Sequence, residues 1–190
     1  MRLQENLPEG VEVGGRFYRM DFDFRNVLKM IDILDRDDLM PEAQEYKALK
    51  CVCKRPRNEH EVLKAVKKLL FQPRKKKGPN VTSFTQDAGL IRAAFRQAYG
   101  IDLYRDRLHW IEFTELLNAI PEDTRYSWVV GIRARPIPPA TKWNQKEREW
   151  LARAKADVAI QMTEEEREKQ YDKDVADIAS ALMAWAKGCD

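Results

Sequence analysis

The chain has 190 residues and a formal net charge of +3, with 44% hydrophobic and 34% charged residues. This length supports one domain with a substantial core, or one domain with an appended helix. No run approaches the roughly 18 apolar residues of a membrane-spanning helix, and the first residues lack the apolar segment of a signal peptide. We therefore expect a protein without membrane segments that stays in the cytoplasm where it is made.

A short β-hairpin is the first predicted element. Val11 and Val13 alternate with polar residues before a pair of glycines, which adopt the positive φ of a tight two-residue turn without strain. An isolated hairpin is only marginally stable in water. We therefore expect it to pack on the helices through Val11, Val13 and one face of Phe17 and Tyr18.

Three helices are predicted after the hairpin. Each has a start signal, namely an N-cap aspartate, a proline in the first turn, and a capping box formed by an asparagine and a glutamate. The predicted helices are residues 24–35 after Asp23, residues 41–53 starting at Pro41, and residues 59–71 after Asn58, with Glu61 completing the box.

The cysteines are odd in number and lack the spacing of a metal site. Cys51 and Cys53 are separated by one residue, whereas structural zinc sites separate paired cysteines by two to four. Such a site needs four ligands, and the chain adds only Cys189, His60 and His109. We interpret the cysteines as free thiols and expect neither a metal nor another cofactor.

A strongly basic segment follows the third predicted helix. Residues 54–77 hold ten lysines and arginines against two glutamates, and such a patch can neutralise phosphates. Phe71 is the only aromatic residue there, so stacking on bases is not supported. We interpret the end of this segment as a loop that is solvated or binds an acidic partner, with nucleic acid as the alternative. Its four consecutive cations are Arg74, Lys75, Lys76 and Lys77.

The strongest helix signals lie in residues 83–131. A capping box of Ser83 with the glutamine three residues later predicts a helix that starts at Phe84, and Gly100 supplies the left-handed residue that ends it. A second helix is predicted over residues 106–120, followed by a corner. These two helices are expected to share one structural core, formed by Phe84, Ile91, Phe95, Trp110, Phe113 and Leu117.

The C-terminal part of the chain has a different composition. Three prolines within residues 136–139 predict an extended link, so we divide the chain into a helical core domain with the hairpin, residues 1–135, and a link with a helical arm, residues 136–190. The arm is expected to contain a helix over residues 142–160 and a second helix after Thr163. We predict that the apolar stripe of this last helix binds a partner through Val175, Ile178, Leu182, Met183 and Trp185.

The sequence contains none of the catalytic motifs that we sought. There is no phosphate-binding glycine loop, nucleophile elbow or zinc-protease helix. No cysteine, serine or carboxylate stands at a motif spacing from His109, which we interpret as a partly buried structural residue. We expect a protein without enzyme activity and of mainly α class: a multi-helix domain with a short N-terminal β-hairpin and a C-terminal helical arm.

Several motifs carry a resemblance to a known family. They are LPEGVEVGGRFY near the N-terminus, the Asp-Phe-Arg triplet at residues 23–25, and most specifically SFTQDAGLIRAAFRQAYGIDL, LHW and PEDTRYSWVVGIR. In these motifs, over roughly residues 7–158, the chain resembles the phage gene product fifteen proteins of tailed bacteriophages and prophages of Gram-positive bacteria. The cationic loop and the charged arm after residue 161 depart from the family's pattern.

The resemblance implies a tail assembly chaperone of a long-tailed phage (siphophage), because genes of this family lie between the tail-tube and tape-measure genes. Such chaperones coat the helical, poorly soluble tape measure protein until the tail tube polymerises around it. The implied partners are the tape measure protein and other tail proteins in the host bacterial cytoplasm, and we expect a homo-oligomer. The alternatives are a nucleic-acid-binding phage accessory protein and a minor structural tail component.

Overall fold

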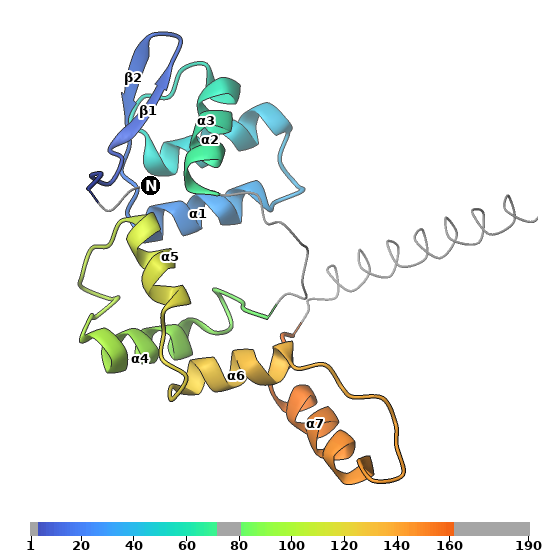
Figure 1. The fold of residues 1–190 in the computed structure, drawn as a ribbon. Helices are drawn as coiled ribbons and strands as arrows, with labels where there is room; N and C mark the ends of the chain where they lie inside the picture. Colours follow the sequence, from blue (N-terminus) through green and yellow to red (C-terminus); the bar gives the residue numbers. More distant parts are fainter. Residues whose placement is uncertain (1–3, 72–80, 162–190) are drawn as a thin grey trace, which may run out of the picture. The chain divides into compact units, whose positions relative to one another are not determined.

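The computed structural model of the protein describes residues 4–71 and 81–161 (Figure 1). The predicted mainly α class is confirmed, since the described residues form seven helices and one two-stranded antiparallel sheet. None of these helices is long and apolar enough to cross a membrane. The elements are β1 (Gly10–Val13), β2 (Arg16–Arg19), α1 (Phe24–Leu34), α2 (Pro41–Val52), α3 (Glu59–Leu70), α4 (Ala88–Tyr99), α5 (Trp110–Asn118), α6 (Arg125–Ala134) and α7 (Gln145–Asp157).

The chain divides into two compact units. Unit 1 comprises Met1–Pro79 and Gly89–Trp128, and unit 2 comprises Asn80–Ala88 and Val129–Asp190. Each unit is therefore assembled from two stretches that are not consecutive in the sequence. The sequence-based division into residues 1–135 and 136–190 stays a prediction, because much of the arm lies outside the described residues.

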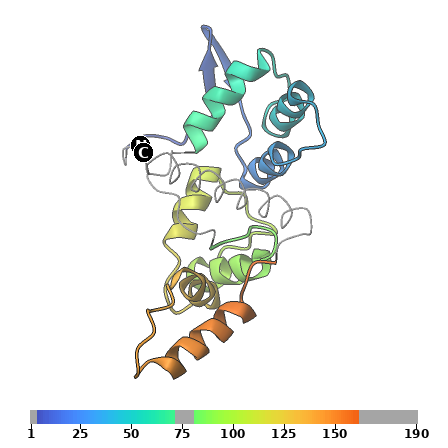
Figure 2. The ribbon, with the colours of Figure 1, turned by 90° about the vertical axis from the view of Figure 1, so that its right-hand side faces the viewer.

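The N-terminal hairpin of unit 1 forms where the sequence predicted it. Val11 pairs with Tyr18 across the two strands and both side chains are buried. Gly14 and Gly15 have φ values of 58° and 72°, as the mirror-image turn requires. The hairpin packs on α3 through β1. Figure 2 shows the hairpin beside that helix. Phe17 is 60% exposed, because neighbouring residues of a strand point to opposite faces and Tyr18 occupies the inner one.

The three helices after the hairpin begin where they were predicted. The Asp23 carboxylate accepts a hydrogen bond from the Arg25 amide at 3.0 Å and caps α1, and Pro41 is the first residue of α2. The capping box predicted for α3 is wrong. Asn58 makes no side-chain cap bond, because its backbone is left-handed with φ 52°, a conformation that asparagine tolerates better than most residues.

The start of α4 differs from the prediction. The Ser83 hydroxyl accepts from the Gln86 amide at 3.1 Å as expected, but residues 84–87 form a turn and the helix begins at Ala88. The Gln86 side chain does not complete a capping box, because it exchanges hydrogen bonds with the backbone of Gln161. The Ser83 amide donates instead to Oδ2 of Asp87 at 2.8 Å.

Four of the six residues predicted to share a core are buried. They are Ile91, Phe95, Trp110 and Phe113. The Phe113 ring stacks on Phe95 at 5.3 Å and on Phe24 at 4.6 Å between ring centroids, and Leu117 is half-buried. Phe84 is wrongly predicted as a core residue: it is 37% exposed because it lies on the turn before α4 and not on the helix.

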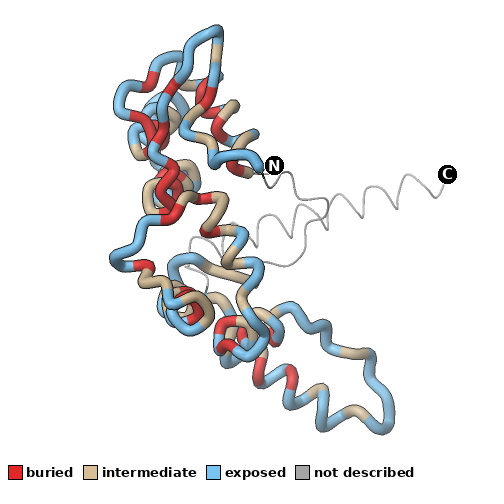
Figure 3. Tube along the Cα trace, turned by 60° about the vertical axis from the view of Figure 1, so that its left-hand side comes forward, coloured by how far each residue is buried: buried red, intermediate tan, exposed pale blue. Residues whose placement is uncertain are grey.

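The sequence analysis did not predict α6, and it predicted a helix longer than α7. A corner was expected where α6 forms, with the Thr124 hydroxyl accepting from the Ser127 amide at 3.2 Å at its start. Gly131 lies inside this helix, where a glycine weakens the sequence signal. In unit 2 the buried residues Leu151 and Ala154 of α7 cluster with Ile132 of α6. Figure 3 shows buried and exposed positions alternating along the helices.

Candidate interaction surfaces

The two surfaces predicted from the sequence lie outside the described residues. These are the apolar stripe of the arm, within residues 175–185, and the cationic loop, residues 74–77. Their role as partner-binding segments therefore stays a prediction. Within residues 4–71 and 81–161, candidate sites are the clusters of polar, charged and exposed apolar side chains.

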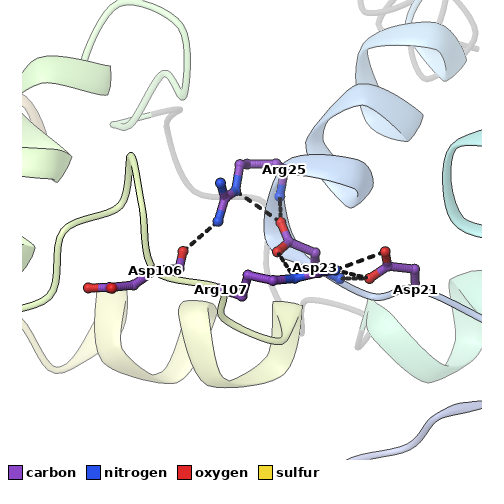
Figure 4. A network of polar contacts seen from close by, with 5 residues as sticks. All are labelled: Asp21, Asp23, Arg25, Asp106 and Arg107. Atoms are coloured by element: carbon purple, nitrogen blue, oxygen red, sulfur yellow. Dashed lines mark hydrogen bonds and ion pairs between the residues drawn. The ribbon is translucent and has the colours of Figure 1, made fainter.

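An arginine–aspartate network joins the segment before α1 to the segment before α5 in unit 1 (Figure 4). Arg107 donates to both carboxylate oxygens of Asp21 at 2.9 Å and to Oδ2 of Asp23 at 3.2 Å. Arg25 donates to Oδ1 of Asp23 at 3.1 Å and to the backbone oxygen of Asp106. The hydrogen bonds to Asp21, and the charges of both aspartates, raise the pKa of Arg107 above its ordinary value. The network fixes the position of the α5 start against that of α1.

His109 completes this junction. Its Nδ1 accepts from the Ile111 amide at 3.1 Å, which makes it the N-cap of α5, and its Nε2 lies 3.1 Å from the Pro8 carbonyl oxygen. Because Nδ1 accepts, the ring proton is on Nε2 and is donated to Pro8. Both nitrogens therefore make structural hydrogen bonds. The predicted structural role is confirmed, but the sequence reasoning placed the residue inside a helix and missed the cap.

A buried ion pair anchors unit 2. Arg133 donates to Asp87 at 2.6 and 2.9 Å, and the two side chains are 10% and 3% exposed. Burial alone would raise the pKa of Asp87, but hydrogen bonds from Arg133 and the Ser83 amide, with the charge of Arg133, hold that pKa below its ordinary value. Arg133 also donates to the carbonyl oxygens of Val81 and Val158. The pair thus ties separate segments of unit 2 together.

A cationic groove lies in unit 1 between β2 and the end of α2, with a volume of about 540 Å³. We define it by its lining residues. The buried residues are Tyr18, Met20, Val52 and Cys53, and the exposed ones include Arg16, Phe17, Arg19, Lys54 and Arg55. The groove therefore combines an apolar floor with a cationic rim, and its last two cations belong to the basic segment recognised in the sequence.

A second surface, in unit 2, exposes large apolar side chains. Ile137 is 44% exposed, Trp143 94% and Trp150 51%, and these three residues are called the apolar surface below. Ile137 and Trp143 precede α7, while Trp150 lies on it. Ile137 also lines a hollow of about 460 Å³ with residues of α7. Trp143 and Trp150 do not line this hollow, but large apolar side chains that stay exposed are candidates for a protein-binding surface.

Another face of α7 is buried in unit 2. Leu151 is fully buried and forms a cluster with Ile132 and Ala154. Val158 packs against this cluster. The Lys155 ammonium donates to the backbone oxygen of Arg133 at 2.6 Å. These contacts fix one face of the helix, so the exposed Trp150 projects from a supported element.

The described cysteines and acidic residues form no metal site. Cys51 and Cys53 are free thiols, and burial raises the pKa of Cys51. No group of three or more histidine, cysteine, aspartate or glutamate residues in the described ranges could hold a metal ion. The clusters that the structure does bring together are the structural network, the buried ion pair, the cationic groove and the apolar surface.

A comparison with known families matches most of the chain. The sequence model of the family described as Bacteriophage Gp15 protein matches residues 3–160. No curated protein and no solved structure matches the chain. The family match contains every described helix and strand, and it includes the cationic groove and the apolar surface. It ends before the charged arm.

Proposed function

This chain belongs to the bacteriophage Gp15 protein family, and from this premise we propose that it is a tail assembly chaperone that binds and solubilises the tape measure protein. In this proposal it acts in the host bacterial cytoplasm during tail morphogenesis, has no enzyme activity and assembles as a homo-oligomer. Other tail proteins are further proposed partners.

The apolar surface carries this proposal. Burying a large apolar side chain stabilises a protein by about 1.5 to 3 kcal/mol relative to leaving it in water. Trp143, at 94% exposed, forgoes nearly all of that stabilisation in the isolated chain. An amphipathic helix that lays its apolar face against Trp143 or Trp150 would bury that side chain. A long helical client with poor solubility presents apolar faces that would cover such exposed side chains.

The support beneath the apolar surface suits it to this task. α7 is anchored through the buried Leu151 and through the hydrogen bond from Lys155 to the backbone oxygen of Arg133, so its outer face is organised before a client arrives. A preorganised surface loses less conformational entropy on binding than one that must fold first. The predicted stripe of the arm, residues 175–185, is a second proposed contact for the client or for another copy.

Co-expression with the tape measure protein tests the proposal. The double variant Trp143→Ser with Trp150→Ser is expected to lower the soluble fraction of the client, because the variant removes most of the apolar surface. The matched control is Tyr104→Ser, which changes an exposed aromatic residue of unit 1. Both variants should keep the unfolding free energy within about 0.5 kcal/mol of wild type, as for ordinary surface changes. A client that stays equally soluble with the double variant would contradict the proposal.

The alternatives are separated by two further observations. Mass spectrometry of purified virions tests whether the protein is a minor structural tail component, since a chaperone is expected to be absent from the finished particle. The genes next to this one test the alternative of a nucleic-acid-binding accessory role. A position between the tail-tube and tape-measure genes supports the chaperone.

A further inference from the structure

The cations of the groove in unit 1 are largely unneutralised within the described residues. Arg19 pairs with Glu9 at 3.4 Å, but these side chains are 81% and 72% exposed, and such pairs bind weakly. Lys54 and Arg55 make no ion pair with any described carboxylate. The one carboxylate that lines the groove, Asp21, already accepts two hydrogen bonds from Arg107. The groove therefore presents an excess of positive charge.

The floor of the groove adds an apolar requirement. Met20, Val52 and Cys53 are buried in the floor, and Phe17, which also lines the groove, is 60% exposed. A purely ionic ligand would leave the Phe17 side chain uncovered. The matching ligand carries carboxylates for the rim and at least one apolar side chain for the floor and for Phe17.

We propose that the cationic groove is a binding site for an acidic, amphipathic helical segment of a partner protein. Carboxylates of the segment would pair with Arg19, Lys54 and Arg55, and an apolar side chain would pack on Phe17. A hollow of about 540 Å³ accommodates a few side chains of one helical face, which is the usual helix-in-groove mode. The surface is distinct in chemistry from the apolar surface of unit 2, and its test needs no tape measure protein.

A nucleic acid fits the same groove less well. Binding of single strands uses several aromatic side chains on which successive bases stack, and Phe17 is the one exposed aromatic residue of the rim. Tyr18 lies in the floor, buried, with the Arg16 guanidinium over its ring at 5.4 Å. The groove therefore favours protein over nucleic acid.

The binding test uses the full chain and three fluorescent probes. The first is a 16-residue helical peptide with glutamate on one face and leucine on the other, the second is its glutamine analogue, and the third is a 16-base-pair duplex DNA. Fluorescence anisotropy at physiological salt is expected to show the acidic peptide binding more tightly than either other probe. The glutamine analogue lacks the charges that the rim attracts.

Two charge-reversal variants localise the binding. Arg19→Glu with Arg55→Glu is expected to weaken the acidic peptide about tenfold, since one exposed ion pair contributes a factor of roughly two to five. The control, Arg105→Glu with Arg153→Glu, makes the same change in net charge at exposed positions outside the groove. It should leave the affinity within about twofold of wild type, because neither side chain lines the groove.

A third variant tests the apolar part of the site. Phe17→Ser is expected to weaken the leucine-containing acidic peptide, but not an acidic peptide in which serine replaces leucine. Equal weakening by the groove and control variants would overturn the proposal, because binding would then follow net charge alone. Tighter binding of the DNA, lost in the groove variant, would reassign the groove to nucleic acid. Unchanged circular dichroism and unfolding midpoints verify that each variant is folded.

Discussion

The two units place their charges and their apolar groups differently. In unit 1 the rings of Phe24, Phe95 and Phe113 stack in the interior, and the arginine–aspartate network lies near the surface, with the Arg107 side chain 70% exposed. In unit 2 an ion pair of Asp87 with Arg133 is itself buried, beside a small apolar cluster. Unit 1 should therefore respond most to lost packing, and unit 2 to lost charge.

The largest expected effect is the loss of an aromatic ring from unit 1. Phe95 is fully buried and contacts both Phe113 and Tyr99. Phe95→Ala should lower the free energy of unfolding by about 3 to 5 kcal/mol, because it removes buried surface and leaves a cavity. Urea denaturation measures this change. A loss below about 1 kcal/mol, within the range of ordinary mutations, would show that the ring stack does not hold unit 1.

Removing the charge of Asp87 should affect unit 2 almost as strongly. Asp87→Asn leaves the buried Arg133 guanidinium without its carboxylate, and breaking such a pair costs about 3 kcal/mol or more. The control within unit 2 is Glu147→Gln, whose pair with Arg135 is half exposed and is worth less than about 1 kcal/mol. Equal losses in the two variants, measured in urea, would remove the distinction between buried and exposed charge.

The same ion pair should make the free energy of unfolding depend on pH in the acidic range. The pKa of Asp87 is lowered in the folded chain, so the folded state binds this proton less readily than the unfolded state does. The stabilisation is fully present above the unfolded value of about 3.9 and is lost as the pH falls through the folded value. The difference in unfolding free energy between wild type and Asp87→Asn should be constant from pH 7 to pH 5 and shrink below about pH 4. A difference unchanged at pH 3 would contradict this.

The smallest expected effect is a gain in α6. A Cβ built on Gly131 meets no atom within 4 Å, and alanine is favoured over glycine inside a helix by roughly 0.5 to 1 kcal/mol. Gly131→Ala should therefore raise the unfolding free energy by about that amount, measured by thermal or urea unfolding. The matched substitution Gly100→Ala should destabilise the chain, because Gly100 has φ 70°. A loss of stability in Gly131→Ala would mean that the residue serves a contact outside the described structure.

Local sequence signals predicted the elements that depend only on residues close together in the chain. The glycine pair of the hairpin, the Asp23 cap and Pro41 each act within a few residues, and those elements appear where they were predicted. The Asp87 carboxylate was not predicted as a site, because its partner Arg133 lies 46 positions away. Gln86 also looked like part of a local cap, but it bonds to Gln161, 75 positions away. Spacing rules carry no information about such contacts.

The candidate surfaces were predicted only in part for the same reason. The sequence indicated a basic segment from residue 54 onward, but not that Lys54 and Arg55 would share a groove with Phe17 of the hairpin. Trp143 and Trp150 lie in the segment predicted as a helix over residues 142–160, but the sequence did not show which of its apolar side chains would stay exposed. Exposure, unlike helix formation, depends on the packing of distant elements.

Hydroxyl-radical footprinting of Trp143, with and without the tape measure protein, tests the central claim most directly. The free chain should be labelled strongly at this residue, which is 94% exposed, and the complex should protect it. Tyr104 of unit 1, also exposed, serves as an internal reference whose labelling should not change. Equal labelling of Trp143 in the free chain and in a verified complex would contradict the assignment of the apolar surface to the client.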